Sequence, residues 1–374
     1  DGSVMTARFQ INHFSSLRDV ESDISWVKPV PLDRVGLSCL SGMPHFRLAG
    51  GQTGFTQVDI SSYDYSSNSL KIWRGSVSDW LQKTKMAQAA SQTLDNIVSA
   101  RPDFAGLDMS ATHLMGVVNV TPDSFSDGGQ YLEREAAISH ANALLSQGAS
   151  IIDIGGESTR PGAAKITIDE ERQRVIPVTQ ALSKRNILVS VDTRNPEIMR
   201  TALLEGATII NDVSGFRNKE CLRVITDAYK AGMSPYVIIM HMQGEPATMQ
   251  EAPSYNFAPI DIYMYLQEQI GLLVSSGLPR SNIAVDVGFG FGKSVKDNLV
   301  LIDWMPLFHG LGVPILIGIS RKSTIAKLDN NAPVDERLGG SIALTLKSAD
   351  AGVQMVRTHD VRQTAQAIKL WQAG

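Results

Sequence analysis

The 374-residue sequence has only two cysteines, Cys39 and Cys221, and they lie far apart in the chain. Neither belongs to a Cys-x-x-Cys pair, so the sequence offers neither a disulfide framework nor a zinc knuckle. We therefore expect a reduced, cytoplasmic setting. No apolar run reaches the length of a membrane span. Residues 1–14 also lack the basic and then apolar segments of a signal peptide.

An excess of charge of one sign is also missing. The 34 Lys and Arg residues nearly balance the 38 Asp and Glu residues, which gives a net charge of −4. This balance argues against a nucleic-acid footprint and against a polybasic membrane patch. Hydrophobic residues make up 43% of the chain, so a large core can form. The length suits two ordinary domains, or one large α/β barrel with an added segment.

From residue 111 to residue 374, short apolar runs alternate with amphipathic stretches. The runs are aliphatic or β-branched and end in polar residues or glycine, which is typical of parallel strands separated by helices. Roughly eight such units over about 260 residues predict an α/β fold, a (β/α)₈ TIM barrel. An open doubly wound sheet is the alternative. The runs are residues 113–120, 150–156, 187–193, 208–215, 236–242, 282–290, 314–320 and 353–359.

Residues 1–110 have a different pattern. Residues 46–76 alternate and are rich in Gly, Ser and Tyr, which predicts short strands and hairpins. Residues 76–103 predict one amphipathic helix, capped by Ser76 or Ser78. We find no residues with an evident chemical role here. We interpret the segment as an N-terminal extension of mixed strands and one helix. Its biochemical role is unknown from the sequence, and we expect it to serve packing or assembly.

Polar residues stand at nearly every predicted strand end of the barrel region. In a barrel of this type, the carboxyl ends of the strands point into the active site. Packing alone explains such a set poorly, because a buried polar group without a partner costs about 1–3 kcal/mol. The residues are Asn119, Asp153, Asp192, Asn211, His241, Asp286, Ser320, Arg321, Lys322, Arg357 and His359.

These residue types indicate the chemistry of the ligand. The carboxylates of Asp192 and Asp286 and the amide of Asn211 suit the N–H and C=O edge of a flat heterocycle, such as guanine or a pterin. Lys322 stands where a helix begins after a strand, a position that favours anions or ring carbonyls. Arg357 and His359 add donors suited to phosphate oxygens.

Two glycine-bearing segments need a separate interpretation. Residues 288–294 look like a phosphate-binding P-loop, but Val287 stands where the first glycine must be. We therefore expect these glycines to let the backbone pass close to a planar ligand, with Phe291 available for stacking. The polar loops 119–129 and 155–162 carry Pro, Gly and hydroxyl residues, and we interpret them as lids that order over a ligand.

Eight motifs in order resemble the dihydropteroate synthase family. They are NVTPDSFSDGG, GGESTRPGA, SVDT, INDVSG, MHMQG, DVGFGFGK, SRKS and RTHDV, and the resemblance covers about residues 112–374. It implies a transferase of folate biosynthesis that joins 6-hydroxymethyl-7,8-dihydropterin pyrophosphate to 4-aminobenzoate. Pyrophosphate would leave by a dissociative, SN1-like route. The resemblance also implies a Mg²⁺ cofactor, a homodimer and sensitivity to sulfonamides.

The same resemblance implies a role for each matching residue. Asp192, Asn211, Asp286, Lys322, Met240 and Phe291 would bind the pterin; Thr159, Arg357 and His359 the pyrophosphate; Phe125, Pro161 and Ser323 the 4-aminobenzoate; Asn119 the Mg²⁺; and Lys322, Asp127 and Asp286 would be catalytic.

Two other functions stay open at this point. One is a pterin-binding relative that has lost catalysis. The other is a barrel of the methyltetrahydrofolate methyltransferase type, which has no evident use for the TPDSFSDGG loop.

Overall fold

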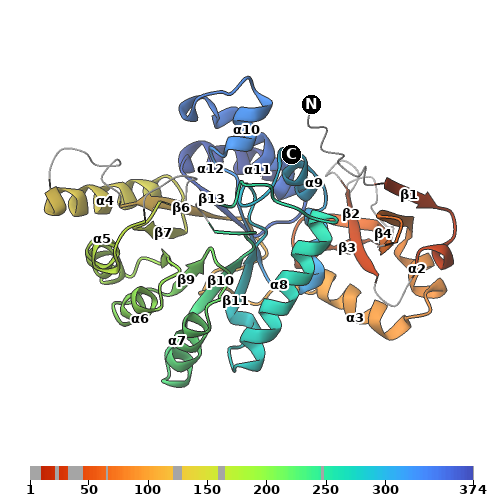
Figure 1. The fold of residues 1–374 in the computed structure, drawn as a ribbon, viewed down its shortest axis with the longest axis horizontal. Helices are drawn as coiled ribbons and strands as arrows, with labels where there is room; N and C mark the ends of the chain where they lie inside the picture. The colour runs from red at the N-terminus through yellow and green to blue at the C-terminus, as the bar shows by residue number, and fades with distance from the viewer. Residues whose placement is uncertain are drawn as a thin grey trace.

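The larger part of the computed structural model is a closed barrel of eight parallel strands surrounded by helices (Figure 1). The structure describes residues 10–21, 25–32, 45–64, 66–120, 129–158, 165–245 and 248–373, without the side chains of 129–132. The predicted (β/α)₈ barrel is confirmed. Its strands, each paired with the next, are β6 (His113–Asn119), β7 (Ile151–Gly155), β8 (Val189–Asp192), β9 (Ile209–Asp212), β10 (Tyr236–Met240), β11 (Ile283–Asp286), β12 (Ile315–Gly318) and β13 (Met355–Thr358).

The helices outside the barrel begin and end at residues suited to those positions. The Thr167 hydroxyl accepts from the Glu170 N–H at the start of α5, which satisfies a backbone donor that the helix leaves free. Gly148 and Gly206, with φ of 112° and 97°, follow α4 and α6. The helices are α4 (Gly129–Ser146), α5 (Ile168–Ser183), α6 (Pro196–Leu204), α7 (Lys219–Lys230), α8 (Ala258–Ser275), α9 (Val295–Asp303), α10 (Ser323–Leu328), α11 (Leu338–Asp350) and α12 (Val361–Ala373), and the 3₁₀ helix η5 (Met305–Leu311) follows α9.

The lower interior of the barrel is a closed apolar floor. Its members come from seven strands: Met115, Ile151, Ile209, Ile238, Ala284, Leu316 and Met355. Phe104 and Met109, from the segment before β6, pack against this layer at the amino-terminal ends of the strands. Side chains of a strand alternate between the two faces, so residues two positions further along also face the interior. The next layer therefore begins immediately above the floor.

The N-terminal extension forms its own sheet and two helices beside α8 and α9 (Figure 1). The sheet order is β1-β5-β4-β2, with β3 paired to β4 and with β1 parallel to β5. The predicted short strands are confirmed. The elements are β1 (Gln10–Phe14), β2 (Trp26–Leu32), β3 (Phe46–Arg47), β4 (Gly54–Asp64), β5 (Ser69–Ser76), α2 (Val77–Lys83) and α3 (Ala87–Val98).

The single helix predicted for residues 76–103 is wrong, because the structure has α2 and α3 there, with a break at Thr84. Thr84 is extended (φ −66°, ψ 140°). Its hydroxyl accepts from the Met86 N–H at 3.1 Å and also contacts the Glu21 carboxylate. Such local side-chain bonds compete with helical ones. Ser76, one of the two expected caps, caps α2.

The extension sheet packs on two cores at once. Val27 and Trp73 belong to a cluster with the apolar residues of α2 and α3. Their neighbours Trp26 and Ile72 belong to the cluster of the barrel and its helices. This alternation along β2 and β5 places the sheet between its own helices and the barrel. The Lys28 ammonium lies 4.8 Å from the centre of the Trp304 ring, just before η5.

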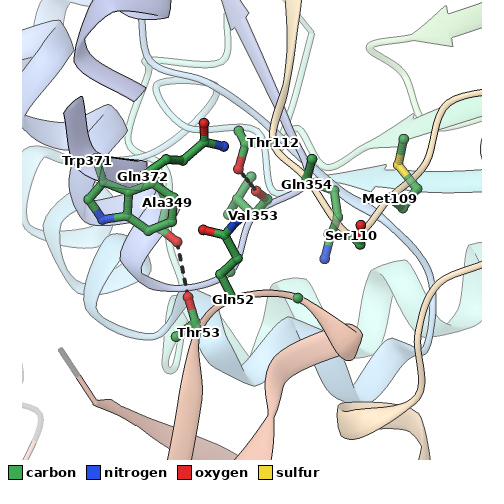
Figure 2. Close-up of a pocket in the computed structure, with 13 residues that line it drawn as sticks. Gln52, Thr53, Met109, Ser110, Thr112, Ala349, Val353, Gln354, Trp371 and Gln372 are labelled. Atoms are coloured by element: carbon green, nitrogen blue, oxygen red, sulfur yellow. Dashed lines mark hydrogen bonds between the residues drawn. The ribbon is translucent and has the colours of Figure 1, made fainter. Parts of the chain in front are cut away.

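A small hollow lies where the extension meets the amino-terminal end of the barrel. Figure 2 shows Gln52 and Thr53 of the extension facing Trp371 and Gln372 of α12 across it, with the Thr53 hydroxyl donating to the Ala349 carbonyl at 3.4 Å. This end is opposite to the polar strand ends, so the hollow is separate from the expected site. Within the described residues, no helix is long and apolar enough to cross a membrane.

We predict that Ile72→Ala lowers the free energy of unfolding by about 2–5 kcal/mol, because it removes buried contacts between the extension and the barrel. Ile11→Ala on the neighbouring strand β1 is the control. Ile11 is 46% exposed, whereas Ile72 is 4% exposed, so the control should change stability by less than about 0.5 kcal/mol. Urea denaturation measures both. Equal effects would show that this face of the sheet does not support the barrel.

Candidate active site at the carboxyl ends of the barrel strands

A polar layer lies directly above the apolar floor of the barrel. The layer follows from the two-residue period of the strands. Except for Asp192, each residue of the layer lies two positions beyond a floor residue of the same strand. Asp192 joins the layer because it pairs with Asn211 in the register of β8 and β9. The side chains of the layer are Val117, Asp153, Asp192, Asn211, Met240, Asp286 and Arg357.

Arg357 occupies the middle of this layer. Its Nε donates to Asp153 Oδ2 at 2.6 Å, and one terminal nitrogen donates to Asp192 Oδ2 at 3.0 Å. The fully buried Asp153 also accepts from the Ser190 hydroxyl at 2.6 Å and from the Asn211 amide at 3.4 Å. Removing one partner of such a buried pair typically costs about 3–5 kcal/mol, because the remaining charge is left uncompensated.

Burial raises the pKa values of two acids at this site and lowers the pKa of one base. It raises the pKa of Asp192 to about 7 despite the nearby Arg357. It also raises the pKa of Asp286, although the Gly288 N–H at 2.7 Å and the charge of Lys322 oppose the shift. Burial, followed by repulsion from Arg357, lowers the pKa of Lys322 to about 7. Such shifted groups in one layer are typical of binding and catalytic sites.

An apolar cluster borders the polar layer. Met240 and Phe291, which the sequence predicts to line a ring pocket, pack together, and the structure adds Val213, Met242 and Met249 to them. The Lys322 ammonium lies 3.7 Å from the centre of the Phe291 ring, within the range of a cation–π contact. A flat ligand could therefore meet both an apolar surface and an ammonium group here.

The side chain of Lys293 stabilises the glycine-rich segment after β11 through hydrogen bonds to backbone carbonyls. This role is not predicted from the sequence. The Lys293 ammonium donates to the carbonyls of Gly288 at 2.8 Å, Phe291 at 3.0 Å and His241 at 3.2 Å. Lys293 is 2% exposed, so it does not point outward as a P-loop lysine must. A Cβ on Gly288 (φ 68°) would lie 1.9 Å from the His241 carbonyl oxygen, which requires glycine. The unusual Gly-Phe-Gly-Phe-Gly-Lys run was the available signal.

Three further predicted residues lie at the rim of the barrel. Asn119 ends β6, and Gly155 separates it from Asp192, since a Cβ on Gly155 would lie 3.7 Å from Asn119 Oδ1 and 3.8 Å from Asp192 Cβ. The His359 ring follows β13, and its Nδ1 lies 3.1 Å from the Ser320 hydroxyl. Ser323 is the exposed first residue of α10, directly after Lys322.

The structure thus brings Asp192, Asn211, Asp286 and Arg357 into one layer, and Lys322 lies beside this layer, against the Phe291 ring. Arg357, predicted to bind pyrophosphate together with His359, donates to the carboxylates of Asp153 and Asp192, and its role toward pyrophosphate stays a prediction. Asp153 is recognisable in the sequence only as a polar strand end, and its role as the main partner of Arg357 appears only in the structure. Four predicted residues, Phe125, Asp127, Thr159 and Pro161, lie outside the described residues.

Comparison with known proteins identifies the class to which this fold and site belong. The model of the family described as "Pterin binding enzyme" matches residues 115–359. Dihydropteroate synthase of Escherichia coli strain K12 is 44% identical over 268 residues, which are 71% of this chain and 93% of that protein.

Solved structures agree with the sequence match. The Xanthomonas albilineans synthase with 4-aminobenzoic acid is 41% identical, with a TM-score of 0.67 over 73% of this chain and 97% of that chain. The Burkholderia cenocepacia synthase complexed with 7,8-dihydropteroate is 38% identical, with a TM-score of 0.65 over 71% of this chain and 92% of that chain. The chain therefore belongs to the dihydropteroate synthase family, a family of transferases in folate biosynthesis.

We predict that the His359 ring stays neutral at physiological pH. Burial and the charges of Arg357 and Arg321 lower its pKa from 6.5 to about 3. The unfolded chain therefore binds a proton below about pH 6.5 that the folded chain does not bind. The contribution of His359 to stability is complete above this pH and is lost as the pH falls. In a proton NMR titration, the His359 resonance, assigned with His359→Gln, should not move between pH 5 and 8. A midpoint near 6.5 would contradict this.

Proposed function

We propose that this chain condenses 6-hydroxymethyl-7,8-dihydropterin pyrophosphate with 4-aminobenzoate to give 7,8-dihydropteroate and pyrophosphate. The observation that carries the proposal is the layer that contains Asp192, Asn211 and Asp286, with Lys322 and the apolar cluster of Phe291 beside it. The apolar floor below the polar layer supports the same proposal, because it closes the barrel at the amino-terminal ends of the strands and leaves the carboxyl ends for a ligand. The ligands named with the similar solved structures, 4-aminobenzoic acid and 7,8-dihydropteroate, fit this chemistry.

The pterin ring would meet the layer edge-on. Carboxylate oxygens of Asp192 and Asp286 can accept from ring and amino N–H groups, and the amide of Asn211 can both donate and accept. The Lys322 ammonium can donate to a ring oxygen or nitrogen. The ring faces would contact Met240 and Phe291. Because the layer is desolvated, each such bond contributes more than it would in water.

Mg²⁺ would be held jointly by the chain and the pyrophosphate. The Asn119 amide oxygen is a hard ligand of the kind that Mg²⁺ accepts, and Mg²⁺ commonly combines one or two protein ligands with phosphate oxygens. In the part of the chain that the structure describes, no three His, Cys, Asp or Glu residues could hold a metal ion together. We therefore propose that Asn119 contributes one ligand. The ion would supply positive charge that offsets the charge of the leaving pyrophosphate.

The bond changes favour a dissociative route. The C–O bond to pyrophosphate breaks and its electron pair leaves with pyrophosphate, while electron release from the dihydropterin ring supports a cation at the exocyclic carbon. The 4-aminobenzoate nitrogen then donates its lone pair to that carbon and loses a proton to solvent. Asp192 and Asp286 would stabilise the electron-poor ring, and we assign Asp127 the same role. Thr159, Arg357 and His359 would bind the pyrophosphate.

The 4-aminobenzoate would lie nearer the solvent than the pterin. Ser323 is exposed beside Lys322, so its hydroxyl can donate to the substrate carboxylate. We assign Phe125 and Pro161 to the loops that close around this substrate, since water must be excluded from a cationic intermediate. From the family resemblance we also propose a homodimer in the cytoplasm. Light scattering that gives the mass of one chain would reject the dimer.

A pyrophosphate-release assay tests the proposed reaction. We expect release that requires both the pterin pyrophosphate and 4-aminobenzoate. Binding of the pterin without release would instead support a relative that has lost catalysis. The methyltransferase alternative would require transfer of a methyl group from methyltetrahydrofolate, which we do not expect.

We predict that Lys322→Ala lowers kcat/KM for the pterin substrate by about tenfold to a hundredfold, because one charge-assisted hydrogen bond contributes about 1.5–3 kcal/mol. The fold should persist, since removing a charged group from a desolvated site relieves its burial cost. Lys327→Ala is the control, because Lys327 is an exposed residue of the same helix. Wild-type kinetics for Lys322→Ala would reject the assignment.

We predict that Mg²⁺ strengthens binding of the pterin pyrophosphate but not of 6-hydroxymethylpterin, which carries no phosphate. Titration calorimetry with magnesium or with a chelator measures both ligands. Asn119→Ala should remove most of the difference between the two conditions and leave the affinity for the phosphate-free pterin unchanged. Equal affinity for the pyrophosphate ligand with and without magnesium would reject the metal role.

A further inference from the structure

Asn298 of α9 is a polar side chain buried almost completely, at 1% exposure. A buried amide is costly unless its donors and acceptor are satisfied. Here every group of the amide has a partner. Asn298 Oδ1 accepts from the Gly290 N–H at 2.7 Å, and Nδ2 donates to the Ser294 carbonyl at 2.9 Å and to the Thr324 hydroxyl at 3.0 Å.

These partners belong to two different segments of the site. Gly290 lies in the loop after β11, between Asp286 and Phe291, whereas Thr324 lies in α10 after β12. The same Nδ2 also lies 3.4 Å from the Lys293 carbonyl, at the end of the glycine-rich segment. One amide therefore ties the loop that carries Phe291 to the helix that begins beside Lys322.

Lys322 lies between the two tied segments. Its Cδ is 3.1 Å from the place where a Cβ on Gly290 would stand, so its stem runs close to the Gly290 backbone. Its ammonium is 3.7 Å from the centre of the Phe291 ring. A shift of the loop relative to α10 would therefore change the distance between the ammonium and the ring, and with it the surface that the two groups present to a flat ligand.

We propose that Asn298 is a positioning residue, which fixes the glycine-rich loop against α10. The Lys322 ammonium and the Phe291 ring, which would both contact the pterin, thereby keep a constant distance from each other. This inference rests on the proposed function, because it assigns the pterin as the ligand of that pair. Asn298 does not touch the ligand. It acts through Gly290 on one side and through Thr324 on the other.

The chain offers a matched control for a buried asparagine. Asn282 lies at the opposite end of β11, is 7% exposed, and donates from Nδ2 to the Pro235 carbonyl at 3.0 Å. Asn282→Ala removes a buried amide of the same kind far from the polar layer. A loss of stability alone should therefore appear in both alanine variants, whereas a change in pterin binding should appear only in Asn298→Ala.

The test is calorimetry of 6-hydroxymethyl-7,8-dihydropterin pyrophosphate with magnesium, together with steady-state kinetics. We expect Asn298→Ala to weaken pterin binding and raise its KM about tenfold, equivalent to about 1.4 kcal/mol, with a smaller change in kcat. Thr324→Val, which keeps the shape but loses the hydroxyl, should weaken binding about threefold. Thr324→Ser should restore it, and Asn282→Ala should leave the pterin affinity unchanged.

Hydrogen exchange supplies a second readout that needs no ligand. In Asn298→Ala and Thr324→Val, the amides of residues 288–293 and of 320–326 should both exchange faster than in the wild type, and in Asn282→Ala they should not. Unchanged pterin affinity in Asn298→Ala, or faster exchange in one segment only, would overturn the inference. A wild-type chain that does not bind the pterin pyrophosphate would overturn the proposed function, and this outcome is visible before any variant is compared.

Discussion

The partly buried guanidinium of Arg357 organises the polar side chains of the upper barrel. It is paired to Asp153 at 2.6 Å and to Asp192 at 3.0 Å, and Asp153 in turn holds Ser190 and Asn211. Four strands are thereby tied together by charge at the level where the apolar floor ends. A single buried charge left without its partner would cost more than a typical core contact, so these side chains form a fixed set.

This fixed set supports the proposal that one layer binds a ring and also assists a reaction. The pKa of Asp192 and that of Lys322 both lie at about 7, since burial opposes the charged form of each. Fixed dipoles and charges in a dry site also stabilise a developing cation without reorganisation, which suits the proposed dissociative route.

The sequence predicted the barrel and the strand-end residues because both follow from short-range rules. The apolar runs mark the strands, and the two-residue period places Asp153, Asp192 and Arg357 on one face. What it could not predict depends on contacts between segments distant in the chain. Lys293 turns inward toward carbonyls of its own loop and toward the carbonyl of His241 in a different segment, and Asn298 is buried because Thr324 of another helix reaches it.

In the N-terminal extension, too, contacts between distant segments could not be predicted from the sequence. Its strands were predictable from their alternation, but the break at Thr84 depends on contacts of its hydroxyl with Glu21 and with the Met86 N–H. Propensity favours one continuous helix there, and a tertiary contact overrides it. The docking of the sheet through Trp26 and Ile72 likewise required the structure.

The central claim is that the polar layer around Arg357 binds a pterin ring. The most direct measurement is a crystal structure of the chain with 6-hydroxymethyl-7,8-dihydropterin pyrophosphate and magnesium. The account predicts the ring edge between Asp192, Asn211 and Asp286, with a ring face against Phe291 and the pyrophosphate toward Asn119 and His359. A pterin bound elsewhere, or a ring that makes no hydrogen bond to these three residues, would contradict it.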